Sequence, residues 1–221
     1  MKKFNLSINK IIILLFLSIK PLYSAEMTDP IKVDWSFKGL TGTFDRASLQ
    51  RGFQVYKEVC SSCHSMQYLS YRNLGESGGP EFTEAEVKAI AASFEVTDGP
   101  DSQGEMFTRP GRPSDMFVSP HPNKEAAAAA NGGAYPPDMS VLVKARKGGA
   151  NYIYSVLVGY EDPPPGVTLD QGVYYNKYMI GNKIKMPNNL EDGLIEYADG
   201  TVSTVDQMAK DVTTFLAWAA E

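Results

Sequence analysis

The sequence predicts a mainly α-helical domain with long loop insertions. Five segments carry either apolar residues at helical spacing or a helix-capping pattern. The whole chain contains 19 glycines and 14 prolines, and two stretches longer than 20 residues are rich in them. The hydrophobic content of 43% is too high for a disordered chain and too low for a multi-span membrane protein, so 221 residues indicate one domain with elaborations.

The first two helices are expected over residues 45–59 and after residue 83. Leu49, Phe53 and Tyr56 share one helical face, and Asp45 can cap the start of that helix. Thr83-Glu84-Ala85-Glu86 has the form of a capping box, and an apolar pattern follows it. The apolar residues of this second pattern are Val87, Ile90, Ala91 and Phe94.

Three further helices follow. Residues 124–130 contain five alanines and end at Asn131-Gly132-Gly133, which is typical of a short helix with a C-terminal stop. Residues 151–160 are predicted to be helical, although their β-branched content leaves a strand open. Thr204 can cap the last helix, and residues 197–201 predict a small hairpin turn around Gly200. The apolar face of the last helix comprises Val205, Met208, Val212, Phe215, Leu216 and Ala219.

Long loops are expected over residues 97–122 and 161–190. Loops of this length are uncommon in a compact domain unless they serve a function. A large buried cofactor that fills part of the core would account for them.

The N-terminus has the pattern of a secretory signal peptide over residues 1–25. Three lysines precede the apolar run Ile11–Ile19, Lys20-Pro21 ends the run, and Ala25 offers a small residue for cleavage. The run is too short for a membrane span, although an uncleaved anchor stays open because Tyr23 is a poor residue near a cleavage site. The leader lacks arginine, so we expect export to a bacterial periplasm and a mature domain over residues 26–221.

The mature domain is acidic. The whole chain carries a net charge of −5, and removal of four lysines with the leader makes it −9. This charge argues against nucleic acid as the main partner. An acidic surface can attract basic proteins, but it can equally serve only solubility.

Cys60-Ser61-Ser62-Cys63-His64 is the attachment signature of haem c. Cysteines three residues apart lie on one side of a helical turn, at a spacing that suits the two vinyl groups of a haem. Each thiol can form one thioether, and the histidine that follows can offer an imidazole nitrogen to iron. The motif holds both cysteines of the chain and one of its two histidines, so it predicts a single covalent haem.

Three other uses of the two cysteines are weaker. A thioredoxin-type dithiol needs a lowered thiolate pKa in a βαβ context, and no such pattern precedes Cys60. A disulfide is possible in an oxidising compartment. Zinc needs two more ligands, which the chain can hardly supply.

The second axial ligand of the iron stays open at this point. A neutral thioether raises the potential of a haem and suits electron transfer. Met186 lies in a loop, late in the chain and before Pro187, which favours it. The other candidates are His121, Met106, Met116, Met139 and Met179, while Met66 lies too close to His64 and Met208 is expected in the core.

Six stretches between about residue 31 and residue 221 form an ordered set of motifs. They are RGFQVYKEVCSSCHSM, RPGRPSDMFVSPHPN, NGGAYPPDMS, YSVLVGYEDPPPGV, YYNKYMIGNKIKMP and DVTTFLAWAAE. In these stretches and in their order, the chain resembles the cytochrome c1 family, the haem subunits of the ubiquinol–cytochrome c reductase (cytochrome bc1) complex.

The resemblance implies a cytochrome c-like haem domain in which Met186 is the second axial ligand. It also implies that Arg146 pairs with a haem propionate, a role that suits a guanidinium fork. Tyr152 and Tyr160 resemble aromatic positions of the haem pocket, and Pro136-Pro137 resembles a turn beside the haem. The first and last helices are expected to cross near the haem.

The function that the resemblance implies is one-electron transfer within a quinol-oxidising complex. The haem would accept an electron from a Rieske iron–sulfur subunit, beside cytochrome b, and pass it to a soluble cytochrome c. We find no catalytic residues in the chain itself. Family members continue past the WAAE motif into a membrane anchor, so we expect an anchor beyond Glu221 on the periplasmic side of the inner membrane.

Two other functions stay open. A free periplasmic cytochrome that shuttles electrons needs no anchor, but the length and long loops of this chain speak against it. A five-coordinate haem that senses gas needs no methionine ligand, so replacement of Met186 would leave its spectrum unchanged.

Overall fold

A computed structural model describes residues 28–221, and the expected signal peptide lies outside this range. The described chain is mainly helical, which confirms the predicted fold class. Its α-helices are α2 (Arg46–Glu58), α3 (Glu84–Ala92), α4 (Lys124–Ala130), α5 (Gly149–Val158) and α6 (Val205–Ala219). Its 3-10 helices are η1 (Cys60–Ser62), η2 (Tyr71–Gly75) and η3 (Ile180–Asn182). Its strands are β1 (Glu95–Asp98), β2 (Phe107–Pro110), β3 (Tyr174–Tyr175) and β4 (Lys183–Ile184).

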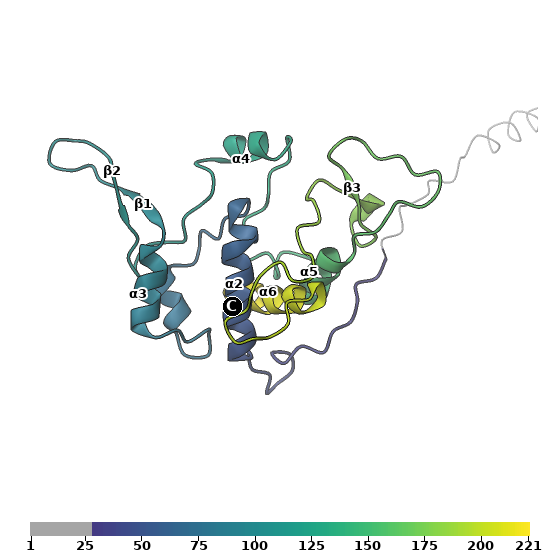
Figure 1. Cartoon of the computed structure of the whole chain (residues 1–221), viewed down its shortest axis with the longest axis horizontal. Helices are drawn as coiled ribbons and strands as arrows, with labels where there is room; N and C mark the ends of the chain where they lie inside the picture. Colours follow the sequence, from purple (N-terminus) through teal and green to yellow (C-terminus); the bar gives the residue numbers. More distant parts are fainter. Residues whose placement is uncertain (1–27) are drawn as a thin grey trace, which may run out of the picture.

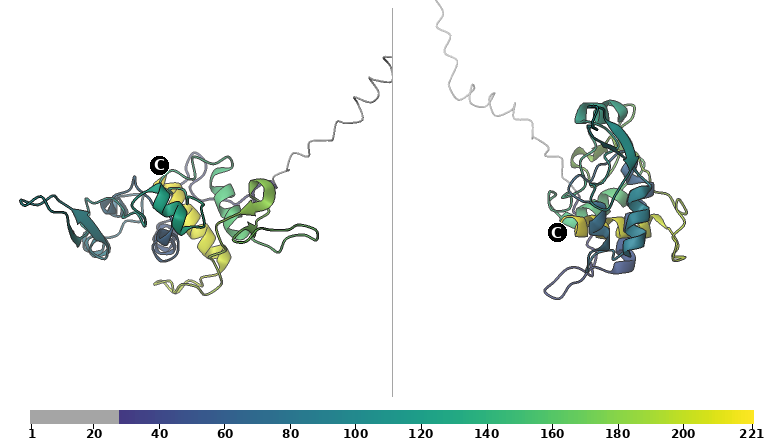
Figure 2. Two further views of the ribbon diagram at one scale, coloured as in Figure 1. Left: turned by 90° about the horizontal axis from the view of Figure 1, so that it is seen from above. Right: turned by 90° about the vertical axis from the view of Figure 1, so that its left-hand side faces the viewer.

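The first and last of these helices, α2 and α6, cross at the centre of the molecule, as Figures 1 and 2 show. Gly52 makes the crossing possible, because a Cβ atom there would lie 2.1 Å from the backbone oxygen of Asp211. The rings of Phe53 and Phe215 meet edge to face beside it, with centroids 5.7 Å apart. The crossing therefore brings two helical backbones close together and packs aromatic side chains around the contact.

A buried ion pair also joins the two helices. Asp211 on α6 is fully buried and accepts hydrogen bonds from Nε and Nη2 of Arg51 on α2, at 2.8 and 3.1 Å. Ser48 and Gln207 donate to the same carboxylate at 2.6 and 2.9 Å. Because the carboxylate is so fully paired, this buried charge is compatible with a stable crossing.

The predicted helix starts are confirmed. Asp45 accepts a hydrogen bond from the backbone N–H of Ser48, and Thr204 accepts one from Gln207. Thr83 and Glu86 form the reciprocal bonds of a capping box. The segment predicted over residues 151–160 is a helix, α5, and not a strand. The apolar face of α5 packs on α6 and buries Ile153.

The prediction of two long, irregular loops is wrong in part, because each contains a short antiparallel hairpin. Strands β1 and β2 pair over four residues each, and the hairpin extends away from α2 and α6 (Figures 1 and 2). Arg109 on β2 pairs with both Asp98 and Asp115, which ties the hairpin to the chain beyond it. Charged pairs of this kind leave no apolar periodicity, so the pattern gave no signal for the strands.

The second hairpin pairs β3 with β4 over two residues each. Residues 197–201 form a turn in which Gly200 donates to the carbonyl of Tyr197, but no hairpin strands flank it. Over residues 28–221, no helix has both the length and the apolar character needed to cross a membrane.

Candidate haem site

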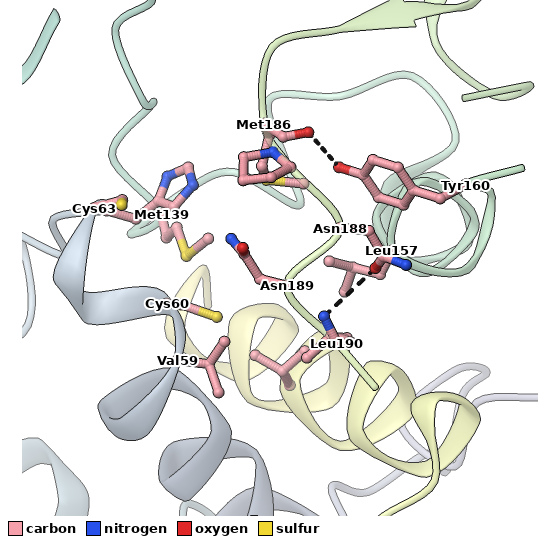
Figure 3. A pocket seen from close by; sticks show the side chains of 13 residues that line it. Val59, Cys60, Cys63, Met139, Leu157, Tyr160, Met186, Asn188, Asn189 and Leu190 are labelled. Atoms are coloured by element: carbon pink, nitrogen blue, oxygen red, sulfur yellow. Dashed lines mark hydrogen bonds between the residues drawn. The ribbon is translucent and has the colours of Figure 1, made fainter. Parts of the chain in front are cut away.

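The cysteine–histidine motif follows directly from the end of α2. The amides of Cys63 and His64 both donate to the carbonyl of Cys60, at 3.1 and 2.9 Å, so the motif coils as one tight turn. Tyr56, one turn earlier on α2, donates its hydroxyl to the carbonyl of His64 at 3.3 Å. As a result both thiols and the imidazole border the same cavity, and Figure 3 shows the two cysteines on one side of it.

This cavity opens partly to solvent. Its walls come from the cysteine–histidine motif after α2, from α5, from α6 and from the loop after β4, and they are largely apolar. The lining residues are Val59, Cys60, Cys63, His64, Met139, Leu157, Tyr160, Met186, Pro187, Asn188, Asn189, Leu190 and Val212.

The backbone of the Pro136-Pro137 turn orients His64. The Nδ1 atom of His64 lies 2.8 Å from the carbonyl oxygen of Pro137, and a carbonyl can only accept, so Nδ1 carries the proton. Burial lowers the pKa of His64 below its usual value, although the bond to Pro137 acts against this shift. The imidazole is therefore neutral, and its Nε2 atom is the basic nitrogen that a metal can take up.

Asp138 holds this turn against the motif. Its Oδ2 atom accepts from the hydroxyl of Ser65 and the amide of Gln67, at 2.7 and 2.9 Å, and its Oδ1 atom accepts from the amide of Ser140 at 2.9 Å. Burial alone would raise the pKa of Asp138, but the hydrogen bonds outweigh burial and leave the pKa below its usual value. Sequence analysis missed Asp138, and its position directly after two prolines was the available signal.

The environment of Cys60 differs from that of a redox-active thiol. Burial, and to a smaller extent Cys63, raise the pKa of the Cys60 thiol to about 12. A thioredoxin-type nucleophile needs the opposite shift. No cluster of three or more His, Cys, Asp or Glu side chains with metal-binding geometry occurs in residues 28–221. The neighbourhood is apolar and suits packing against a flat hydrophobic group.

Two of the candidate methionines line the cavity, Met186 and Met139. Met186 enters from the loop after β4, and its carbonyl accepts a hydrogen bond from the hydroxyl of Tyr160 at 2.9 Å (Figure 3). Met139 is buried and follows Asp138. Met106 and Met116 are exposed, and Met179 accepts a hydrogen bond from Tyr152 elsewhere. His121 lines a separate hollow, which Cys63 also borders.

Of the remaining predicted site residues, Tyr160 lines the cavity, whereas Tyr152 and Arg146 do not. Arg146 is exposed, and its Nη1 atom bonds only to the neighbouring carbonyl of Ala145 within the described chain. The cavity residues Val59, Leu157 and Val212 were not predicted, because nothing in the sequence marks an apolar residue as a pocket residue rather than a core residue.

The residues around the cavity fit a haem c group. Two thiols, a neutral imidazole with a free Nε2 atom and a thioether sulfur meet at one apolar cavity, and these are the donors that such a group uses. A helical domain with this site has the features of the class of c-type cytochromes.

The chain belongs to the cytochrome C1 family, whose model matches residues 35–221. It is 54% identical over 187 residues to "Cytochrome c1-2, heme protein, mitochondrial" of Solanum tuberosum, covering 85% of this chain and 71% of that protein. It is 51% identical over 206 residues to "Cytochrome c1" of Rhodospirillum rubrum, covering 86% of this chain and 75% of that protein.

Some relatives are considerably longer than this chain. "Cytochrome b/c1" of Bradyrhizobium diazoefficiens is 51% identical over an alignment of 206 residues, covering 85% of this chain and 30% of that protein. A second potato protein, "Cytochrome c1-1, heme protein, mitochondrial", is matched over 58% of its length.

Proposed function

We propose that this chain is the haem-carrying electron-transfer subunit of a cytochrome bc1 complex. The observation that carries the proposal is the meeting of Cys60, Cys63, His64 and Met186 at one largely apolar cavity. In this proposal the two cysteines would hold a haem c through thioethers, and His64 and Met186 would ligate its iron. Bound in this way, the haem supplies a one-electron iron couple.

Each of these residues has a separate task. Cys60 and Cys63 would each hold the haem through one thioether, a linkage that forms without oxidation because S–H adds across a C=C bond. His64, fixed by Pro137, keeps its Nε2 atom unprotonated for the iron. Met186 provides a neutral sulfur, which favours the reduced state and a high potential. The largely apolar walls would limit the reorganisation of polar groups that accompanies a change of charge.

Arg146 belongs to the proposal as the partner of a haem propionate. Its guanidinium is free of carboxylate partners in the described part of the chain, and it lies three residues before α5, which contributes to the cavity wall. An arginine fork matches a carboxylate in geometry and charge.

The partners follow from the same proposal. Cytochrome b and a Rieske iron–sulfur protein are the neighbours in the complex, the Rieske protein is the electron donor, and a soluble cytochrome c is the acceptor. The names of two relatives, "Cytochrome b/c1" and "Cytochrome b-c1 complex catalytic subunit, mitochondrial" of Candida albicans, support this assignment. The proposal includes a cleaved leader over residues 1–25, a membrane anchor and a position on the periplasmic side of the inner membrane.

Rapid mixing tests the function directly. The haem-loaded protein, reduced in its native membrane, is mixed with oxidised soluble cytochrome c, and both haem spectra are followed. Fast oxidation that saturates with acceptor concentration is expected. Failure to transfer electrons, combined with carbon monoxide binding to the reduced protein, would instead favour a five-coordinate sensor. Recovery of all the protein in the soluble periplasmic fraction would favour a free shuttle.

A further inference from the structure

The loop that carries Met186 has few attachments to the rest of the molecule. It leaves strand β4 at Ile184 and is exposed from Pro187 to Asn189, until Leu190 returns to the core. Within the described chain, two hydrogen bonds join residues 185–190 to other segments. One is the bond from Tyr160 to the carbonyl of Met186, and the other runs from Lys185 to the carbonyl of Gly132.

These two bonds differ in environment. The Lys185 ammonium is exposed, so water competes with its bond to Gly132. The Tyr160 hydroxyl is half-buried at the cavity wall and bonds at 2.9 Å to Met186 itself, as Figure 3 shows. A hydrogen bond shielded from water costs more to break than an exposed one, because the separated groups stay partly desolvated.

Tyr160 is itself held firmly. It follows Gly159, where a Cβ atom would lie 2.4 Å from the ring of Tyr178, so that the end of α5 packs closely on this segment. Tyr160 forms a β-bridge with Asn176, and Asn176 donates to the carbonyl of Val156 at 2.7 Å. The phenol therefore extends from a rigid corner of α5 toward a weakly attached loop.

We infer that Tyr160 is a positioning residue that holds the Met186 loop closed over the haem site through its hydroxyl. Tyr160 acts on the backbone of Met186 and not on the iron. Loss of the hydroxyl increases the fraction of molecules in which the loop is open. The inference rests on the proposed role of Met186 as an axial ligand.

Imidazole binding to the oxidised, haem-loaded protein measures this opening, because imidazole can reach the iron only when Met186 has left it. The apparent affinity of such a ligand scales with the open fraction. Loss of one ordinary hydrogen bond, about 1 kcal/mol, corresponds to about fivefold. Tyr160→Phe is therefore expected to bind imidazole about fivefold more tightly than the unmodified protein, with a smaller gain for Lys185→Ala.

Tyr154→Phe is the matched control. Tyr154 lies on α5, the helix that ends just before Tyr160, and donates its hydroxyl to Asp206 at 2.5 Å, but it does not line the cavity. The control is expected to lower the urea midpoint of global unfolding without tightening imidazole binding. Equal imidazole affinities for Tyr160→Phe, Tyr154→Phe and the unmodified protein would overturn the inference.

Met186→Leu separates this inference from the proposed function. If Met186→Leu keeps the near-infrared methionine–iron band, the ligand assignment fails and the role of Tyr160 fails with it. If Met186→Leu loses the band while Tyr160→Phe binds imidazole as the unmodified protein does, only the role of Tyr160 fails.

Discussion

The cysteine–histidine side of the cavity comes from one continuous stretch, from Val59 to His64, whereas the methionine side combines the end of α5 with a loop about 25 residues later. The first side is the continuation of a buried helix that crosses α6. The second side depends on a two-residue ladder and on one hydrogen bond from Tyr160.

This difference separates two kinds of stability within one site. In the proposed haem site, the residues that would hold the haem permanently follow a helix with many buried contacts. Met186, the proposed second ligand, is carried by a segment with few contacts, and such segments open at a lower free energy than the core. We therefore expect changes on the first side to affect folding and changes on the second to affect the properties of the iron.

The largest effect is expected from removal of both thiols. In Cys60→Ser combined with Cys63→Ser, no thioether can form, and the domain should lose its haem and with it part of its core. The measurement is haem stain after denaturing electrophoresis and acid–organic extraction, for which the unmodified protein is the positive control. Full haem stain in the double variant would contradict covalent attachment.

The second-largest effect is expected from disruption of the crossing between α2 and α6. Arg51→Ala leaves the buried carboxylate of Asp211 without its cation, and breaking such a pair costs roughly 3–5 kcal/mol. The urea midpoint of global unfolding should fall, and the methionine–iron band should disappear together with the helical signal. Lys88→Ala, which breaks the exposed pair with Glu84, is the matched control and should leave the midpoint unchanged. A midpoint in Arg51→Ala equal to that of the control would contradict the importance of the buried pair.

Met186→Leu tests the methionine side alone. The potential should fall by about 0.1 V or more, equivalent to roughly 2.3 kcal/mol per electron, within the ~0.8 V range that axial ligands control. The near-infrared band should disappear while global stability changes little. Met139→Leu, at the other methionine of the cavity, should keep the band. The reverse pattern would assign the ligand to Met139.

The smallest effect is expected from salt, which screens the surface charge of the domain and so slows electron transfer to cytochrome c. With residues 1–25 removed the domain carries a charge of −9, and such a charge attracts a basic cytochrome c. The bimolecular electron-transfer rate should fall about tenfold as added salt shortens the Debye length from about 30 Å at 0.01 M to about 10 Å at 0.1 M. A rate that is independent of salt would reject electrostatic docking but not electron transfer.

Features that depend only on residues close together in the chain could be predicted from the sequence. The caps at Asp45, Thr83 and Thr204 lie within three residues of the amides that they accept from, so they depend on local geometry alone. The Cys60–His64 motif is a single turn for the same reason. The hairpins β1–β2 and β3–β4 were missed because ion pairs and backbone ladders between distant residues hold them, not an apolar period.

The sequence by itself thus determined the helices, their start points and the side of the site that a five-residue motif encodes. Only the tertiary structure decided that Pro137 fixes the tautomer of His64, that Met186 and Met139 but not His121 border the cavity, and that Arg146 lies exposed. These contacts join segments tens of residues apart, and their geometry follows from the close approach of α2 and α6 at Gly52 and from the packing of α5. A contact of that kind depends on how whole elements pack, and no local pattern of residue types records it.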